Sequence, residues 1–307
     1  IESEQFCDCG GKLKTYHIGN NIKKIGNDAF RGTALSTLTI SNSVTYIGGN
    51  AFKGTQISSV TLPQDMGYVG DHAFGNCPNL KDVTINSKNP NFVKAAFANM
   101  GGIGGTLTAT STPSITFSYR MFYGSQFGTV KITAANKITL YDEVFTMSGK
   151  GIGSSITMKA NQVISEFKQQ GSTVQQYGDP FYVTNFESIS IEAADSIQLG
   201  YGAFRSARYL ESVSLIAKNS IRLGGWALAH GPKLKTATFD TKKIFFATNT
   251  FSNCGNLENF IMSSSVESLN VPSTDDKTFL GCSKLKLFPL WRSVTSELGM
   301  ATDVSHY

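Results

Sequence analysis

One repeat unit of this chain reads Leu35-Ser-Thr-Leu-Thr-Ile-Ser-Asn-Ser-Val-Thr-Tyr-Ile-Gly-Gly-Asn-Ala-Phe52. Within it, Leu38 and Ile40 are two positions apart, so both side chains leave a short strand on the same face. A second apolar pair follows a polar turn, and the unit closes on an Ala-Phe dipeptide. The unit therefore predicts a strand, a turn and a returning segment that ends at a buried phenylalanine.

The closing phenylalanine recurs along the whole chain, about every 22 to 25 residues. A fixed period of about 20–29 residues is typical of a leucine-rich-repeat solenoid, in which each coil contacts only its neighbours. We predict a β-rich (α+β) solenoid of about twelve coils of 22–25 residues, with short strands stacked in a parallel sheet. We also predict that the closing residues stack as a continuous spine, made of Phe6, Phe30, Phe52, Phe74, Phe97, Phe122, Phe145, Phe167, Phe204, Leu228, Phe251 and Phe279.

The returning segment takes two forms. Early units space its apolar pair by three residues, as in Val44 and Ile47, and units in the middle of the chain space it by two, as in Ile138 and Leu140. Spacing by two is strand alternation, whereas spacing by three indicates a more irregular path. We therefore expect the second edge of the solenoid to become more regularly β between residues 110 and 225.

The composition, with 40% hydrophobic residues, 30 glycines and 8 prolines, suits a folded chain with many turns. No apolar run approaches the length of about 18 residues that a transmembrane helix needs, so none is predicted. Eight basic and two acidic residues lie between Arg205 and Lys243, although the whole chain carries only +5. This stretch is either a solvated surface or a docking patch for an acidic partner. No aromatic-and-basic groove accompanies it, so a nucleic-acid partner is not expected.

No set of residues predicts catalysis. The four histidines stand outside any motif with a nucleophile and an acid, and acidic residues pair only as neighbours, at Asp142-Glu143 and Asp275-Asp276. Adjacent strand residues point to opposite faces, so neither pair makes an acid/base dyad. We predict no enzyme activity, no cofactor and no metal site.

Four of the five cysteines occupy one repeat position, three residues after the spine phenylalanine. Free cysteine packs as a small hydrophobe, so buried thiols are expected there. Only Cys254 and Cys282 are in adjacent coils, where their Cα atoms could approach within the about 7 Å that a disulfide requires. The sequence leaves this bridge open, and the cysteine spacings do not fit a zinc site.

These cysteine units carry a resemblance to a known family. They read Cys9-Gly-Gly-Lys-Leu13, Cys77-Pro-Asn-Leu80, Cys254-Gly-Asn-Leu257 and Cys282-Ser-Lys-Leu285, and Asn42-Ser-Val44-x-x-Ile47-Gly-x-x-Ala51-Phe52 leads into the next unit. Over essentially its whole length the chain resembles the BspA-type leucine-rich repeat of bacterial surface proteins. The resemblance implies a right-handed solenoid in a secreted or surface-anchored protein that binds host or neighbouring-cell components. Residues 100–160 depart from the pattern, since they lack the cysteine and are rich in glycine.

The outward positions of the first strands carry hydroxyl side chains at both sites in seven of the twelve units. Such residues are at home on any exposed strand, and they would also suit a flat, uncharged surface that recognises a glycan or a protein. Interruptions at Asp82, Lys131, Ile261 and Pro289 argue against an ice-binding surface. The candidate contact residues on this face are Thr37, Thr39, Thr61, Thr106, Thr108, Thr157, Ser190, Ser214, Thr236 and Thr238.

Two insertions interrupt the period, one of roughly fourteen residues in Lys168–Asn185 and a polar one around Val271–Lys277. The first contains large amphipathic aromatic residues, which are typical of contact loops, although loop growth without a function is the simpler alternative. The remaining candidate contact residues are Tyr177, Phe181 and Tyr182 in this insertion, and Arg205 and Arg208 in the basic stretch.

We expect residues 1–290 to form the solenoid and residues 291–307 a C-terminal cap or tail. Because Ile1 falls inside a repeat, we also expect that a leader or a further repeat was removed upstream. The predicted function is a non-catalytic, extracellular or cell-surface binding or adhesion protein with an unidentified protein or glycan ligand, and a monomer is assumed. The alternatives are a structural solenoid spacer that displays another domain and, as a minor one, an ice- or carbohydrate-binding protein with a flat Thr/Ser face.

Overall fold

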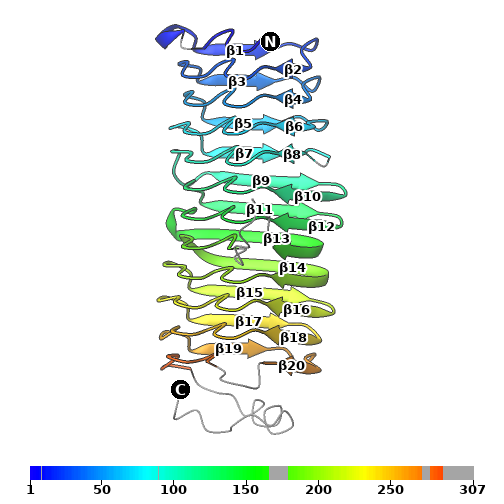
Figure 1. Ribbon diagram of the computed structural model, residues 1–307, viewed down its shortest axis with the longest axis vertical. Helices are drawn as coiled ribbons and strands as arrows, with labels where there is room; N and C mark the ends of the chain where they lie inside the picture. The colour runs from blue at the N-terminus through cyan, green and yellow to red at the C-terminus, as the bar shows by residue number, and fades with distance from the viewer. Residues whose placement is uncertain (8, 89, 166–178, 272–276, 286–307) are drawn as a thin grey trace, which may run out of the picture.

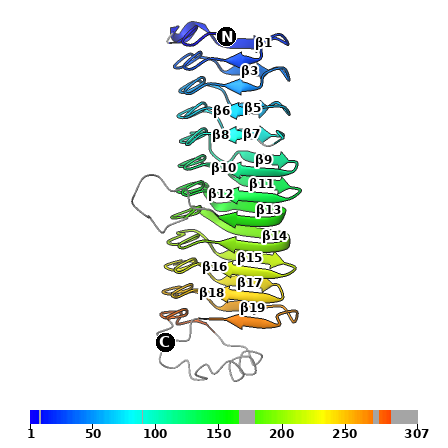
Figure 2. The same ribbon diagram turned by 45° about the vertical axis from the view of Figure 1, so that its right-hand side comes forward.

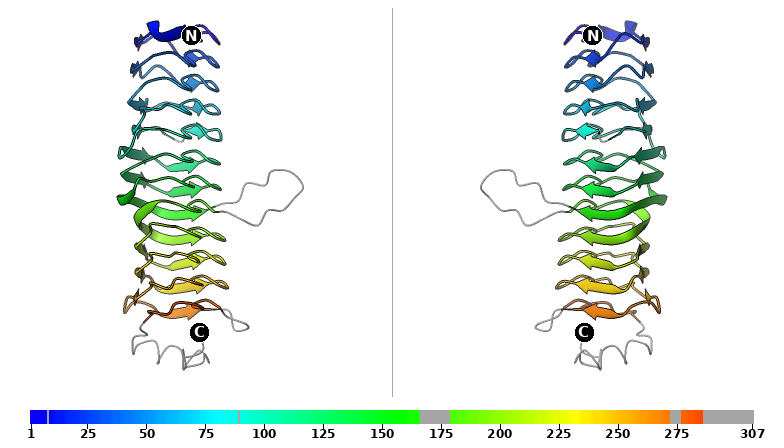
Figure 3. Two further views of the ribbon diagram at one scale, coloured as in Figure 1. Left: turned by 90° about the vertical axis from the view of Figure 1, so that its left-hand side faces the viewer. Right: turned by 90° about the vertical axis from the view of Figure 1, so that its right-hand side faces the viewer.

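The computed structural model shows one elongated stack of coils (Figure 1), and the coils remain layered when the stack is seen from its sides (Figure 3). It describes residues 1–307 except 8, 89, 166–178, 272–276 and 286–307. The chain advances one coil per repeat, from β1 (Thr15–Ile18) at one end to β19 (Asn259–Met262) and β20 (Ser268–Asn270) at the other. The predicted tail and most of both insertions lie outside the described residues.

The first strands of the coils are parallel and line one side of the stack. Burial alternates along them as predicted, since β5 buries Val60 and Leu62 and turns Ser59 and Thr61 outward. Eleven first strands occur in the described residues, so the predicted number of about twelve coils is approximate. Besides β1 and β19 they are β3 (Thr37–Ile40), β5 (Ser59–Leu62), β7 (Asp82–Ile85), β9 (Thr106–Ser111), β11 (Thr129–Ala134), β13 (Gly151–Ser165), β14 (Phe186–Leu199), β15 (Ser212–Ala217) and β17 (Thr236–Asp240).

The returning segments form a second line of strands whose lengths follow the apolar spacing (Figure 2). Where the spacing is three, the strands have two residues, in β2 (Lys24–Ile25), β4 (Tyr46–Ile47) and β6 (Tyr68–Val69), and β8 (Asn91–Phe92) has two residues as well. Where it is two, they have four, in β10 (Ser114–Phe117), β12 (Lys137–Leu140), β16 (Ser220–Leu223) and β18 (Lys243–Phe246), while β13 and β14 run through both lines. A short 3-10 helix, Gly10–Lys12, precedes β1. The predicted regular second edge in the middle of the chain is confirmed.

The spine phenylalanines stack as predicted. The rings of Phe30 and Phe52 lie 5.1 Å apart at an interplanar angle of 5°, and those of Phe74 and Phe97 lie 4.9 Å apart at 4°. A backbone hydrogen bond accompanies each step: the N–H of Phe52, for example, donates to the carbonyl oxygen of Ala73 at 2.8 Å. Ring stacking and amide bonding therefore join the same pair of neighbouring coils at the same point.

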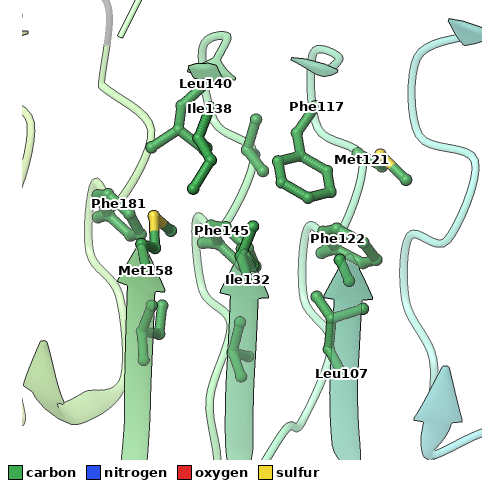
Figure 4. Packing of buried hydrophobic residues seen from close by; sticks show 14 of the residues in the cluster. Leu107, Phe117, Met121, Phe122, Ile132, Ile138, Leu140, Phe145, Met158 and Phe181 are labelled. Carbon is green, nitrogen blue, oxygen red and sulfur yellow. The ribbon is translucent and has the colours of Figure 1, made fainter. Parts of the chain in front are cut away.

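Phe181 occupies the spine position predicted for Phe167. Phe145 donates its N–H to the carbonyl oxygen of Pro180 at 2.7 Å, and its ring stacks on that of Phe181 at 5.5 Å and 3° (Figure 4). Phe181 then stacks on Phe204 at 4.9 Å and is fully buried. The choice of Phe167 was therefore wrong, and so was the choice of Phe181 as a contact residue, because its ring belongs to the core. The insertion precedes the spine residue of its coil.

Leu228 fills the one gap in the row of rings, as predicted. Its N–H donates to the carbonyl oxygen of Thr250 at 2.8 Å, and its side chain is buried. Aromatic contacts resume at Phe251, which packs edge-on against Phe239 at 6.1 Å and Phe246 at 5.4 Å. Rings from the strands thus fill the core beyond the coil that lacks a spine ring.

The first-strand sheet is divided, because β3 and β5 are not hydrogen-bonded to each other. β1 and β3 form a two-stranded sheet, and β5 begins the larger sheet that continues to β19; the wider step between them is visible in Figure 1. The two coils stay joined elsewhere, since Tyr46 of β4 pairs with Tyr68 of β6 and Phe52 bonds to Ala73. The opening is therefore confined to the first-strand side, and the regular unit pattern did not predict it.

Truncating Phe181 to alanine tests its place in the spine. Because the ring is fully buried between two others, Phe181→Ala should lower the free energy of unfolding by about 3–5 kcal/mol, the loss also expected for Phe74→Ala. The measurement is chemical denaturation followed by circular dichroism. Tyr182→Ala, a truncation of the half-buried neighbour, is the control and should cost clearly less. Equal stability of the Phe181 variant and the wild type would contradict the assignment.

Candidate functional site

The outward side chains of the first strands form two parallel columns, which we call the hydroxyl face. Because the strands are parallel and in register, equivalent residues are direct neighbours, so Thr157 of β13 pairs with Ser190 of β14, and Ser190 with Ser214 of β15. The first column is Thr15, Thr37, Ser59, Asp82, Thr106, Thr129, Ser155, Ser188, Ser212, Thr236 and Asn259, and the second is His17, Thr39, Thr61, Thr84, Thr108, Lys131, Thr157, Ser190, Ser214, Thr238 and Ile261.

The hydroxyl face is more continuous than the sequence indicated. At the predicted interruptions by Asp82 and Lys131, the other outward residue of the same strand is still a threonine, Thr84 or Thr129. The Asp82 carboxylate also accepts a hydrogen bond from the N–H of Thr106 at 2.9 Å, so it is engaged by the next coil. Thr84 and Thr129 were missed because only units with hydroxyls at both outward sites were considered.

The hydroxyls of the face differ from the buried hydroxyls of the spine turns. Buried ones bond to the backbone of the spine turns, as Thr33 does with the carbonyl oxygen of Phe30 at 2.9 Å and Ser125 with that of Phe97 at 2.9 Å. Within the described ranges, the hydroxyls of the face make no side-chain hydrogen bond to the protein. The face therefore offers uncharged donors and acceptors that are free for a ligand.

Three cysteines sit at the same turn position as these buried hydroxyls. Cys77, Cys254 and Cys282 are buried free thiols, and each donates to the carbonyl oxygen of the spine residue one coil earlier, which is Phe52, Leu228 or Phe251, at 3.2, 3.1 and 3.1 Å. Burial raises the pKa of Cys254 to about 12 and that of Cys282 to about 11. The predicted buried thiols are confirmed at these three sites and wrong for Cys9, which is exposed; Cys254 and Cys282 are not bridged. Cys, Ser or Thr stands at this position in nine of the twelve spine turns, and the other three carry Met100, Ala207 and Gly231.

The first insertion is described only in residues 179–185, so Tyr177 lies outside the described residues. Tyr182 is half-buried, and the Arg205 guanidinium lies over its ring at 5.5 Å from the centroid. Of the residues that flank the undescribed part, Ser165 pairs with Leu140 in the second line of strands, and Asp179 lies in the spine turn. Neither flank belongs to the hydroxyl face.

The basic stretch does not form one patch. Arg222 of β16 stacks over the ring of Phe245 at 4.3 Å from the centroid, whereas Lys235, next to β17, pairs with Glu211 at 2.8 Å. Arg208 is exposed. The basic residues thus come from second strands, from turns and from segments that flank the first strands, and several have local partners. This distribution favours a solvated surface over a docking patch for an acidic partner.

Two carboxyl groups from successive coils influence each other at the spine turn, which the sequence did not predict. Burial raises the pKa of Asp142 to about 7, and the charges of Asp179 and Glu143 add to this effect. Burial also raises the pKa of Asp179 to about 6, although the positive charge of Arg205 opposes it. One oxygen of each aspartate is buried without a hydrogen-bond partner. The expectation that acidic residues pair only as sequence neighbours was therefore wrong.

Asp179 packs against Gly202 of the following coil, where a Cβ atom would lie 2.4 Å from its Oδ1. Asp179 is thus packed closely against the next turn, although both aspartates remain partly exposed. Among the described residues, no group of three or more His, Cys, Asp or Glu side chains is placed to hold a metal ion.

Comparison with known proteins identifies the family. The model of the BspA type leucine rich repeat region matches residues 1–128 and 177–297, in six copies. The chain belongs to this family. No curated protein matches the chain. No helix in the described residues is long and apolar enough to cross a membrane.

Solved structures of bacterial repeat proteins are similar to this BspA-type chain at low identity. A leucine-rich repeat protein from Bacteroides ovatus is 18% identical with a TM-score of 0.38, covering 93% of this chain and 81% of that one. A leucine rich cell surface protein from Faecalibacterium prausnitzii is 20% identical with a TM-score of 0.35; the match covers 96% of this chain and 65% of that protein. The pneumococcal vaccine antigen PcpA is 17% identical with a TM-score of 0.39, covering 92% and 76%.

Thiol labelling tests the turn position. Because the thiolate is the reactive form and burial raises the pKa of Cys254 and Cys282, iodoacetamide at pH 8 should modify exposed Cys9 in the folded protein and spare Cys77, Cys254 and Cys282. Peptide mass spectrometry measures the modification, and the chain unfolded in guanidinium, where all of them should react, is the control. Labelling of the buried thiols at the rate of Cys9 would contradict the assignment.

The aspartate pair predicts a pH dependence of stability. Both folded-state pKa values lie above the ordinary aspartate value of 3.8, so the folded chain holds these protons more tightly than the unfolded chain. The resulting stabilisation is complete below about pH 4 and is lost as the pH rises through 6 to 7. Asp142→Asn, which stays neutral, should therefore raise the melting temperature at pH 8 and change it less at pH 5.

Asp240→Asn is the control of opposite sign for this experiment. Hydrogen bonds from Ser263 and Ser265 lower the pKa of Asp240, so this carboxylate stabilises the fold above pH 4 and its loss should lower the melting temperature at pH 8. A fall in the melting temperature of the Asp142 variant at pH 8 would show that the buried pair is not under electrostatic strain.

Proposed function

We propose that this chain is a non-catalytic, secreted or cell-surface binding protein whose hydroxyl face recognises a protein or glycan of a host or neighbouring cell. The observation that carries the proposal is the row of unpartnered Thr and Ser hydroxyls on consecutive first strands. These groups repeat at the spacing between parallel strands, about 4.8 Å. A ligand with regularly placed hydrogen-bonding groups would meet a partner at each strand.

The proposed location at the cell surface is supported by the family and by similar proteins. Membership of the BspA-type repeat family supports an extracellular role, as do the similar proteins described as a leucine rich cell surface protein and as a vaccine antigen. The non-catalytic role is supported by the core, where stacked rings and strand side chains fill the interior of the coils. The half-buried aspartates lie in a packed turn, where one oxygen of each has no hydrogen-bond partner.

The test begins with binding of the whole chain to a glycan array and to a panel of purified extracellular-matrix proteins. We expect at least one ligand from the two assays together. Thr108→Val and Thr157→Val should then each lower the affinity for the tightest-binding ligand about fivefold, because each removes one hydrogen bond worth about 1 kcal/mol. Valine keeps the shape and the strand preference of threonine, so the fold should be unaffected.

Thr116→Val is the matched control. Thr116 lies on β10 of the same coil as Thr108, is similarly half-exposed and points outward from the second line of strands. Its replacement should leave binding unchanged. If Thr116→Val and Thr108→Val lowered the affinity equally, the hydroxyl face would not be the binding site. If neither the glycan array nor the protein panel gave a ligand, the spacer role would be favoured.

A further inference from the structure

The break in the first-strand sheet opens a cavity of about 540 Å³ on the hydroxyl face, between β3 and β5. Two residues of β3, Leu38 and Ile40, are only half-buried there. Their counterparts on β5, Val60 and Leu62, are 6% and 1% exposed. The opening therefore exposes an apolar floor, whereas the first strands from β5 to β17 bury the equivalent residues.

Pro63 contributes to this opening. It follows β5 at the repeat position that Ser263 holds after β19, and Ser263 donates its N–H to the carbonyl oxygen of Phe239 in the preceding coil at 3.0 Å. Proline has no N–H, so this bond between neighbouring first strands cannot form at β5. Because the second strands and the spine of the two coils remain bonded, the cavity is a fixed feature of a folded stack.

The rim of the cavity is polar and uncharged. Hydroxyls come from both strands and side-chain amides from the turns that follow them, and every polar side chain that lines the cavity is neutral: Thr39, Asn42, Ser59, Thr61, Gln64 and Asn86. None of these six side chains donates or accepts a hydrogen bond within the described chain. A ligand therefore meets an apolar floor with a ring of free, neutral hydrogen-bonding groups.

We propose that this cavity, the β3–β5 cleft, binds a short neutral saccharide. A sugar ring combines an apolar C–H face with an equatorial rim of hydroxyls, which is the same combination that the floor and rim of the cleft present. A volume of about 540 Å³ lies within the range of about 300–1,000 Å³ typical of small-ligand sites. Anionic sugars are disfavoured, because no cation lines the cleft to replace their hydration. This assignment rests on the proposed binding role and adds the ligand class and its position.

Saturation-transfer NMR and calorimetry on the whole chain test this assignment. The probes are maltotriose, cellotriose, chitotriose and lactose, with sialyllactose and a heparin disaccharide as charged comparators. At least one neutral probe should bind, and bind more tightly than both charged ones. Hydrogen exchange in its presence should show protection of residues 36–42 and 58–64 and leave the remaining first strands unchanged.

The double variant Asn42→Ala/Gln64→Ala removes two exposed amides from the rim and should weaken the neutral probe about tenfold or more. The matched control is Asn161→Ala/Gln198→Ala, which removes an exposed Asn and an exposed Gln elsewhere on the stack and should leave the affinity unchanged. All four side chains are exposed, so both proteins should fold like the wild type.

Three results would overturn the cleft assignment without touching the proposed function. One is that no neutral saccharide binds while a matrix protein does. Another is that a saccharide binds but is weakened by Thr108→Val and not by the rim variant, which places it elsewhere on the hydroxyl face. The third is that the rim variant abolishes binding of a matrix protein only, which assigns the cleft to a peptide. If the proposed binding function itself is wrong, no ligand should bind in any of these assays.

Discussion

The structure depends on one hydrogen bond that recurs at every coil. From Phe6 to Phe251, the N–H of each spine residue donates to the carbonyl oxygen of the residue before the next spine residue, at 2.6–3.0 Å. The bond requires a sharp turn beside the ring, and the residue two positions earlier takes a left-handed φ in most coils, whether it is Asn50 at 53°, His72 at 51° or Trp226 at 58°. Such values cost most residues some strain, so the spine bond and the stacked ring must outweigh that strain in each turn.

This arrangement separates what must be kept from what can vary. The ring, the turn and two strand residues per coil form the core, and the outward positions have no part in it. The hydroxyl face could therefore be read from the sequence once the period was known, because alternation along each strand assigns its side chains to one face or the other. The change in the second line of strands was predictable for the same reason, since spacing by three cannot keep both apolar residues on one side of a strand.

The error at Phe167 shows where the period alone is insufficient. Phe167 follows Phe145 by 22 residues and Phe181 precedes Phe204 by 23, so either ring keeps the period on one side of the insertion. The turn chemistry decides between them. Three residues after Phe181 stands Thr184, which is buried and donates to the backbone, whereas Gln170 follows Phe167. Cys, Ser or Thr stands at that position in most coils, so this turn pattern favours Phe181 over Phe167.

The aspartate pair and the cleft could not be predicted from the sequence, for different reasons. Asp142 and Asp179 are 37 residues apart, and their approach depends on where the insertion leaves the coil, which the same error hid. The cleft lies between two units that both fit the strand pattern, so the pattern predicts a ladder between them. Pro63 was the one sign of a missing bond, but a proline at the end of a strand is compatible with ordinary pairing at an edge.

Because Cys, Ser and Thr replace one another beside the spine, the fold does not require oxidation of its cysteines. No described coil relies on a sulfur–sulfur bond, and the buried thiols act only as small hydrogen-bond donors. The same stack can therefore stand in a reducing interior and in an oxidising exterior, and lineages could exchange these cysteines for serine without rebuilding a turn. A solenoid of this kind needs no change in its covalent bonds when it moves between a reducing and an oxidising compartment.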